Sequence, residues 1–175
     1  MIIDEIFSPV IGKFCWAAEK GYGSFLTFEF GQPNLDIWEK YRSKDGLREK
    51  RRSVAVHGDW HLWIYLCDWQ IYSRDEVRAT SHSSTRDIQR AMRRLDGQVL
   101  THVEVHPSCA TTFVFELHDR LETMPNVSEY GQDSEQWLLY EQAGNVLTLR
   151  ADQMYCYMPG NTNPKDHTWQ PLIFA

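Results

Sequence analysis

Hydrophobic and polar residues alternate along much of the chain, which is the pattern of β-strands. Two of the predicted strands, residues 24–30 and 35–41, should form a hairpin, because the turn-forming sequence GQPN separates them. Residues 61–72 are apolar on both faces, which predicts one central strand that is covered on both sides or passes through a closed sheet. Further strands are predicted at residues 53–57, 99–105, 111–117, 121–124, 136–141, 145–150 and 154–158.

One segment, residues 83–97, has the pattern of a helix instead. Ser83 or Ser84 can cap its N-terminus, and Gly97 is suited to end it. Its apolar residues recur at i, i+3, i+4 and i+7 and form one buried stripe, made of Ile88, Ala91, Met92 and Leu95. This stripe leaves four arginines on the outer surface: Arg86, Arg90, Arg93 and Arg94.

These elements predict a single α+β domain, residues 1–175, built mostly from antiparallel sheet. Short internal similarities indicate two helix-plus-meander halves, residues 1–80 and 81–158, with residues 159–175 docking on the body. IGK at 11–13 resembles DGQ at 96–98, Trp63 aligns with Trp137, and residues 4–11 correspond to the arginine-rich helix. In this scheme residues 42–52 are inserted in the first half. Chance similarity between aromatic strands is the alternative.

Two histidine motifs raise the question of a metal centre. HGDWH places His57, Asp59 and His61 at alternate positions, and HVEVH does the same for His102, Glu104 and His106. Alternate residues of a strand share a face, so each motif could present two imidazoles and a carboxylate together.

The second motif is better explained as a solvated ridge, because its interleaved valines continue the pattern of a half-buried strand. Pairing Val103 with Phe113 and Thr101 with Phe115 would place the apolar side chains on one face. It would also set Glu104 opposite Thr112 and His102 opposite Val114.

The first motif stays open, with His57, Asp59 and His61 as candidate metal ligands. The alternative is a Gly-Asp turn between two strands, with both histidines facing water, and we expect this second outcome.

Other signs of catalysis are weak. The chain has no nucleophile elbow, P-loop or dinucleotide-binding glycine motif. Cys67 lies within an apolar strand, where a thiol is normally inert. Asp68 needs a partner if it is buried, and an arginine or a tryptophan indole would serve. We therefore expect no cofactor and a non-catalytic protein.

Charge is distributed unevenly. Residues 40–52 and 86–94 together hold eleven Lys/Arg and three Asp/Glu, a local charge of +8, and the remainder carries −14. This basic surface could bind phosphates, with these arginines as candidates: Arg48, Arg51, Arg52, Arg86, Arg90, Arg93 and Arg94. The acidic remainder would repel nucleic acid, so a protein partner or a homodimer fits such segregation equally well.

The remaining bulk features suggest a cytoplasmic protein. No stretch approaches the length of an apolar membrane span, and the N-terminus is acidic where a signal peptide would be basic. The four cysteines are scattered, which favours reduced thiols over a disulfide framework or a structural zinc site.

The stretches GYGSFLTFEFGQP and HGDWHLWIYLCDWQI resemble a family of small bacterial proteins without an assigned activity. The resemblance covers most of the chain, brings no catalytic residues, and implies by analogy an immunity or accessory role. The leading hypothesis is a protein–protein interaction protein, of immunity or regulatory type. A nucleic-acid-binding module that uses residues 42–52 and the arginine-rich helix is the first alternative. A metal-dependent enzyme is the second.

Overall fold

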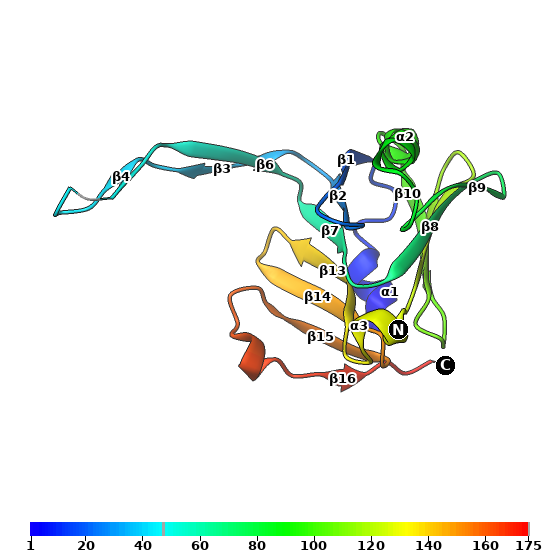
Figure 1. Cartoon of the computed structure of the whole chain (residues 1–175). Helices are drawn as coiled ribbons and strands as arrows, with labels where there is room; N and C mark the ends of the chain where they lie inside the picture. The colour runs from blue at the N-terminus through cyan, green and yellow to red at the C-terminus, as the bar shows by residue number, and fades with distance from the viewer. Residues whose placement is uncertain (47, 175) are drawn as a thin grey trace.

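The computed structural model describes residues 1–46 and 48–174; Leu47, in the predicted basic loop, and Ala175, in the C-terminal segment, lie outside the described residues. Within these residues, two antiparallel sheets form the body of the protein (Figure 1). The larger sheet has seven strands. In spatial order they are β1 (Cys15–Lys20), β2 (Leu26–Phe30), β7 (Trp60–Ile64), β13 (Glu135–Glu141), β14 (Asn145–Arg150), β15 (Met154–Pro159) and β16 (Gln170–Pro171).

The smaller sheet has five strands in the described part of the chain. In spatial order they are β10 (Leu100–Val105), β11 (Thr111–Phe115), β12 (Asp119–Met124), β8 (Asp68–Ser73) and β9 (Glu76–Thr80). Each sheet combines strands from the first and the second half of the chain. The predicted dominance of antiparallel sheet is therefore confirmed.

The helix predicted at residues 83–97 is α2 (Thr85–Leu95), which packs against β1 and β9. The side chain of Ser84 caps it by accepting a hydrogen bond from the backbone N–H of Asp87. All four residues of the predicted stripe are buried, and the four arginines are exposed. The remaining helices are short: α1 (Ile2–Phe7), α3 (Val127–Tyr130) and the 3-10 helix η1 (Pro164–Asp166).

The core lies between the two sheets and is strongly aromatic. Phe7 of α1 contacts both Phe113 of β11 and Trp137 of β13, with ring centroids 6.0 and 5.7 Å apart. Phe113 and Trp137 also meet each other across the core, at 6.1 Å. All three side chains are fully buried. Because large aromatic side chains remove the most apolar area from water, this cluster joins α1 to both sheets.

The prediction of one strand over residues 61–72 is wrong. β7 ends at Ile64 and β8 begins at Asp68, and the two strands belong to different sheets. The turn between them is held by the N–H of Tyr65, which donates to the carbonyl of Gln136 at 2.8 Å. The segment is rich in apolar residues because both strands face the same core from opposite sides.

The predicted hairpin between residues 24–30 and 35–41 is also wrong. β3 (Asn34–Trp38) pairs with β6 (Ser53–His57), away from the sheet that contains β2. The chain leaves that sheet at Gly31, whose φ of +79° turns it outward, and Pro33 follows directly before β3. GQPN is therefore a turn out of the sheet and not the loop of a hairpin.

The pairing of β10 with β11 follows most of the sequence-based register. His102 lies opposite Val114, Val103 opposite Phe113, and Glu104 opposite Thr112, as predicted. The predicted pairing of Thr101 with Phe115 is wrong. The register shifts between Leu100 and His102, and Leu100 pairs with Phe115. A bulge of this kind inserts one unpaired residue, and sequence alternation does not reveal it.

The starts of β1 and β10 face each other in a symmetrical manner. The N–H of Gly12 donates to the carbonyl of Leu100, and the N–H of Gly97 donates to the carbonyl of Cys15, each at 2.8 Å. Phe14 and Val99 form a bridge between these two bonds. The buried positions of α1 and its following turn have the same spacing as those of α2: Ile3, Ile6, Phe7 and Val10 against Ile88, Ala91, Met92 and Leu95.

Trp63 and Trp137, which the sequence similarity aligns, are not structurally equivalent. They lie on neighbouring strands of one sheet, where Trp63 of β7 pairs with Leu138 of β13. Trp137 is fully buried in the core, whereas Trp63 is partly exposed on the outer face of the sheet.

The C-terminal segment returns to the larger sheet. β16 pairs with β15, and Leu172 is buried at the edge of the core. No helix in the described part of the chain has the length and apolar character needed to cross a membrane.

Candidate functional site

A two-stranded arm, residues 34–57, projects from the body of the protein (Figure 1). Its inner part is the pair β3–β6, and its outer part is the short pair β4 (Tyr41–Arg42) and β5 (Glu49–Lys50). The arm belongs to the connection between the neighbouring strands β2 and β7, residues 31–59. The neighbouring strands β11 and β12 of the other sheet are joined by residues 116–118 alone. A long excursion is therefore not needed to connect strands of this kind.

One face of the arm consists of aliphatic side chains that no other part of the described chain covers. In the β3–β6 register, Leu35 pairs with Val56 and Ile37 pairs with Val54, so all four side chains lie on the same face. Their exposed fractions are 62% for Leu35, 55% for Ile37, 55% for Val54 and 53% for Val56. We call this set the aliphatic face.

The root of the arm is held by Asp59. One carboxylate oxygen of Asp59 accepts a hydrogen bond from the N–H of Gln32 at 2.8 Å, and the other accepts from the side-chain amide of Asn34 at 3.1 Å. The side-chain amide of Gln142, in the loop after β13, donates to Asn34 at 3.1 Å. Asp59 therefore links the chain segment that leaves the arm to the segment that enters it.

Two glycines beside Asp59, Gly31 and Gly58, allow the chain segments that enter and leave the arm to approach closely. A Cβ atom on Gly58 would lie 2.3 Å from the carbonyl oxygen of Phe30, which is far inside van der Waals contact. A Cβ atom on Gly31 would lie 2.5 Å from a carboxylate oxygen of Asp59. A larger residue would thus displace the root at either position.

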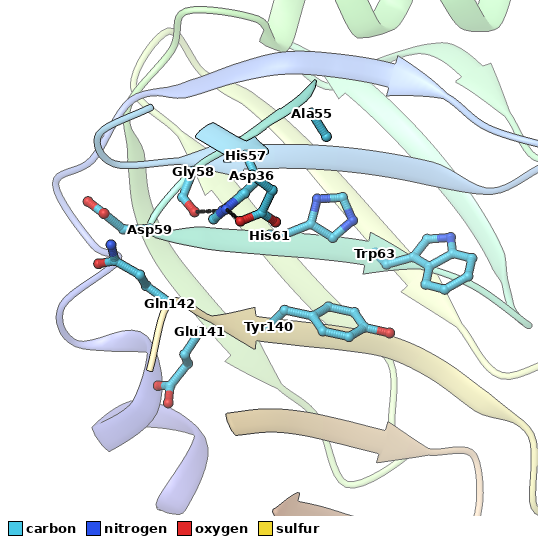
Figure 2. Close-up of a pocket in the computed structure, with 10 residues that line it drawn as sticks. All are labelled: Asp36, Ala55, His57, Gly58, Asp59, His61, Trp63, Tyr140, Glu141 and Gln142. Atoms are coloured by element: carbon cyan, nitrogen blue, oxygen red, sulfur yellow. Dashed lines mark hydrogen bonds and ion pairs between the residues drawn. The ribbon is translucent and has the colours of Figure 1, made fainter. Parts of the chain in front are cut away.

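A pocket of about 480 Å³ lies between the root of the arm and the outer face of the larger sheet (Figure 2). Asp36, Ala55 and His57 line it from the arm. His61 lines it from β7, and the aromatic side chains of Trp63 and Tyr140 extend the wall along the sheet. His57 and His61 thus line a pocket, where we expected them to face water; both are partly exposed at its opening.

His57 fixes the arm to its root. Its Nδ1 lies 2.9 Å from the carbonyl oxygen of Gly58, and its Nε2 lies 3.3 Å from a carboxylate oxygen of Asp36 on the opposite strand. The bond to the Gly58 carbonyl raises the pKa of His57 above its ordinary value, and the hydrogen bond and charge of Asp36 add to this. The doubly hydrogen-bonded, protonated form is therefore favoured.

His61 is held by Glu29 instead. Its Nδ1 lies 2.6 Å from one carboxylate oxygen of Glu29, and the N–H of Gly58 donates to the other oxygen at 2.8 Å. Because a carboxylate only accepts, the Nδ1 of His61 carries the proton in this pair. Glu29 is buried, so these two donors compensate for its removal from water.

The three candidate metal ligands of the first histidine motif thus have separate partners. His57 binds Asp36 and Gly58, Asp59 binds Gln32 and Asn34, and His61 binds Glu29. Among the residues that the structure describes, no three His, Cys, Asp or Glu side chains form a group that could hold a metal ion. The geometry gives the metal hypothesis no support.

The second histidine motif is a ridge on β10. Val103 and Val105 are buried, whereas His102 and Glu104 are exposed. His106 lies at the end of the strand, 3.9 Å from a carboxylate oxygen of Glu104. These are the features of a half-buried strand with a solvated outer side.

The candidate arginines fall on two separate surfaces. Arg48, Arg51 and Arg52 lie near the end of the arm, where Arg52 forms an ion pair with Glu39 at 2.8 Å. The other four lie on α2, which packs on the body well away from that end (Figure 1): Arg86, Arg90, Arg93 and Arg94. Arg94 also donates to Ser73 at 2.8 Å. The structure therefore does not bring the two basic segments together into one surface.

Neither Cys67 nor Asp68 has the features of a catalytic group. Cys67 is buried, which raises the pKa of its thiol and keeps it protonated. Asp68 accepts hydrogen bonds from Ser81 and Asn126, each at 3.0 Å. The hydrogen-bond donors to Asp68 are thus a serine and an asparagine, and not the arginine or indole that the sequence suggested. The indole of the neighbouring Trp69 donates to the carbonyl of Ser24 instead.

Sequence reasoning missed the aliphatic face. A signal for it was present on both sides of the basic loop, since large aliphatic residues alternate with Asp36 in LDI before it and with the small Ala55 in VAV after it. Such alternation also predicts an ordinary strand with its apolar side in the core. Only the position of the arm outside the body shows that this side is uncovered.

Comparisons with protein-family models, with curated proteins and with solved structures found no match to this chain. The functional argument therefore depends on the arm, its root and the pocket beneath it.

Proposed function

We propose that this protein is a non-catalytic protein-binding protein whose arm carries the binding surface. The observation that carries the proposal is the aliphatic face, in which four side chains on a projecting ribbon are more than half exposed. Exposed apolar surface is costly in water, and a contiguous patch of it usually marks a site of protein interaction. An immunity or regulatory role is one function that such binding would serve.

The construction of the arm supports the same proposal. A two-stranded hairpin is marginally stable by itself, and it gains stability when a second layer covers its apolar side. The ion pair between Arg52 and Glu39 and the pair between His57 and Asp36 each link the two strands of the ribbon. The arm is thus prepared for a partner before that partner binds.

The basic end of the arm would contribute selectivity. Residues 40–52 hold seven Lys/Arg against Asp45 and Glu49, a net charge of +5. A partner with an acidic rim around an apolar centre would match both parts, because charge around an interface steers association and discriminates between partners.

The test compares the wild-type chain with an arm-less variant in which residues 31–59 are replaced by Glu-Leu-His, the tripeptide that joins β11 to β12. Both chains are used as bait under cross-linking conditions, and captured proteins are identified by mass spectrometry. We expect a defined protein, this chain included, that is captured by the wild type and lost with the arm-less variant. Identical captures by both chains would contradict the proposal.

We also propose that the two halves of the chain arose by duplication. What supports this is the matched hydrogen bonding at Gly12 and Gly97 and the equal spacing of the buried positions in α1 and α2. In this scheme β1-β2-β7 corresponds to β10-β11-β12, and the arm replaces a short turn in the first half. Separate expression of residues 1–80 and 81–175 tests independent folding. We expect neither piece to fold alone, because each sheet needs strands from both.

A further inference from the structure

We infer that the partner of the aliphatic face is a second copy of this chain, so that two arms pack face to face and antiparallel about a two-fold axis. This inference rests on the proposed function and names its partner. Three features of the arm support it: the symmetry of the aliphatic face, the distribution of charge along the chain, and the spacing of charged residues from the centre of that face.

The aliphatic face is suited to pack against itself. It consists of two cross-strand pairs, Leu35–Val56 and Ile37–Val54, on either side of the pair Asp36–Ala55. A two-fold axis at the level of Asp36 and Ala55 would lay the Ile37–Val54 pair of one copy over the Leu35–Val56 pair of the other. Two ribbons stacked about 10 Å apart would form a small two-layer structure and bury all eight aliphatic side chains.

Charge favours the antiparallel arrangement over the parallel one. The segment 40–52 carries +5, whereas the rest of the chain holds eleven basic and 22 acidic residues and carries −11. Antiparallel arms would direct the basic end of each copy toward the acidic body of the other. Parallel arms would instead place two +5 segments side by side, where they repel each other.

In the proposed dimer, the spacing of residues along the arm would place Arg51 of one copy and Asp59 of the other at the same distance from the two-fold axis. From Ala55, Arg51 lies about four residues toward the end of the arm and Asp59 lies about four residues toward its root, roughly 13 Å in each direction. The proposed axis therefore brings Arg51 of one copy level with Asp59 of the other. Both residues are an even number of positions from Ala55 and so lie on the side of the ribbon opposite to the aliphatic face, where their attraction would act around the edge of the two stacked ribbons.

A nucleic acid fits these features less well. Phosphates would be attracted to Arg51 and its neighbours, but the four aliphatic side chains would give a phosphate backbone no favourable contact. The acidic body would also repel it. A second copy satisfies the aliphatic face and the basic segment together.

Sedimentation velocity of the full chain, at concentrations from about 1 to 100 µM, tests this inference. We expect the mass of two chains. The double variant Ile37→Thr with Val54→Thr should weaken association by about a hundredfold or more, because the dimer would bury hydroxyl groups without partners. The matched control is Val77→Thr, since Val77 of β9 is exposed to a similar degree but lies on the body. It should leave association unchanged.

The charged contact is tested in the same instrument. Arg51→Glu should weaken the dimer, and adding salt should weaken the wild-type dimer but have little further effect on this variant. All variants change exposed residues, so circular dichroism at a concentration where every chain is monomeric should show the wild-type spectrum and melting temperature and confirm that each remains folded.

Three results would overturn the inference. The first is a monomeric wild-type chain throughout the concentration range. If the arm still captures another protein in that case, the proposed function stands and only the second copy is excluded. The second is a dimer that the double variant leaves intact, because association would then use another surface. The third is binding of a DNA duplex that Arg51→Glu abolishes and the double variant retains, which would identify nucleic acid as the ligand.

Discussion

Ile37 of β3 and Val54 of β6 lie opposite each other across the arm, and each side chain is 55% exposed. In the body, comparable cross-strand pairs such as Leu62 with Leu139 are fully buried. The arm thus has the internal pattern of a core strand pair without a core to cover it. This relationship distinguishes a binding element from an ordinary surface hairpin.

The body should fold without the arm. When residues 31–59 are replaced by Glu-Leu-His, we expect native circular dichroism and a melting temperature lowered by no more than about 10 °C, because the aliphatic face contributes no contacts to the core and the main loss is the Gly58 N–H that donates to buried Glu29. Thermal unfolding at low protein concentration checks this. An unfolded arm-less chain would show that the arm is part of the folding unit and would weaken the case for a dedicated binding element.

The root should tolerate no side chain at position 58. Gly58→Ala should destabilise the protein by about 1–3 kcal/mol, since the new Cβ atom would collide with the carbonyl oxygen of Phe30 and force β2 and β7 apart. Urea denaturation measures the change. Gly21→Ala is the control, because a Cβ atom there meets nothing closer than 3.5 Å. Equal stability of the two variants would contradict the close approach at the root.

The attachment of the arm should depend on pH. The pKa of His57 is raised in the folded protein, first by the Gly58 carbonyl and then by Asp36, so its protonated form stabilises the fold. That contribution is complete below the unfolded pKa of about 6.5 and is lost as the pH rises through the folded pKa.

An NMR titration of the His57 ring protons should therefore give a midpoint above about 6.5. Asp36→Asn should lower that midpoint, because it removes the negative charge at 3.3 Å. The hydrogen-exchange protection factors of β3 and β6, which are corrected for the intrinsic effect of pH on exchange, should fall at the higher pH. A midpoint at or below about 6.5 would show that His57 is not held as described.

The aromatic cluster should dominate the stability of the body. Phe7→Ala should cost about 3–5 kcal/mol, because Phe7 is fully buried between Phe113 and Trp137. Phe14→Ala, at a half-exposed position, should cost much less. Chemical denaturation of both variants checks the difference. A small loss with Phe7→Ala would mean that α1 is not part of the core.

Local sequence patterns were sufficient for elements whose apolar side faces the body. The stripe of α2 and most of the register between β10 and β11 follow from residue spacing alone, because burial and periodicity agree there. The same logic failed at residues 61–72, since an unbroken apolar run does not show where a chain crosses from one sheet to the other. It also failed at the bulge near Thr101, which alternation conceals.

The candidate site was only partly predictable. HGDWH joins two strands, as expected, but its histidines line a pocket where we expected them to face water. The partners Glu29, Asp36 and Asn34 come from distant positions that no local motif reveals. The basic loop was recognised by its charge. The exposure of the strands that support it depends on the path of the whole arm, which is a tertiary property.

The central claim is that the aliphatic face of the arm is the surface that contacts a partner protein. Site-specific photo-cross-linking in cells tests it most directly, with a photoreactive amino acid placed at position 37 in one variant and at position 77 in another. Ile37 and Val77 are similarly exposed, at 55% and 51%, but only Ile37 lies on the aliphatic face. We expect discrete cross-linked products from position 37 and none from position 77. Products from position 77 alone, or the same products from both positions, would contradict the claim.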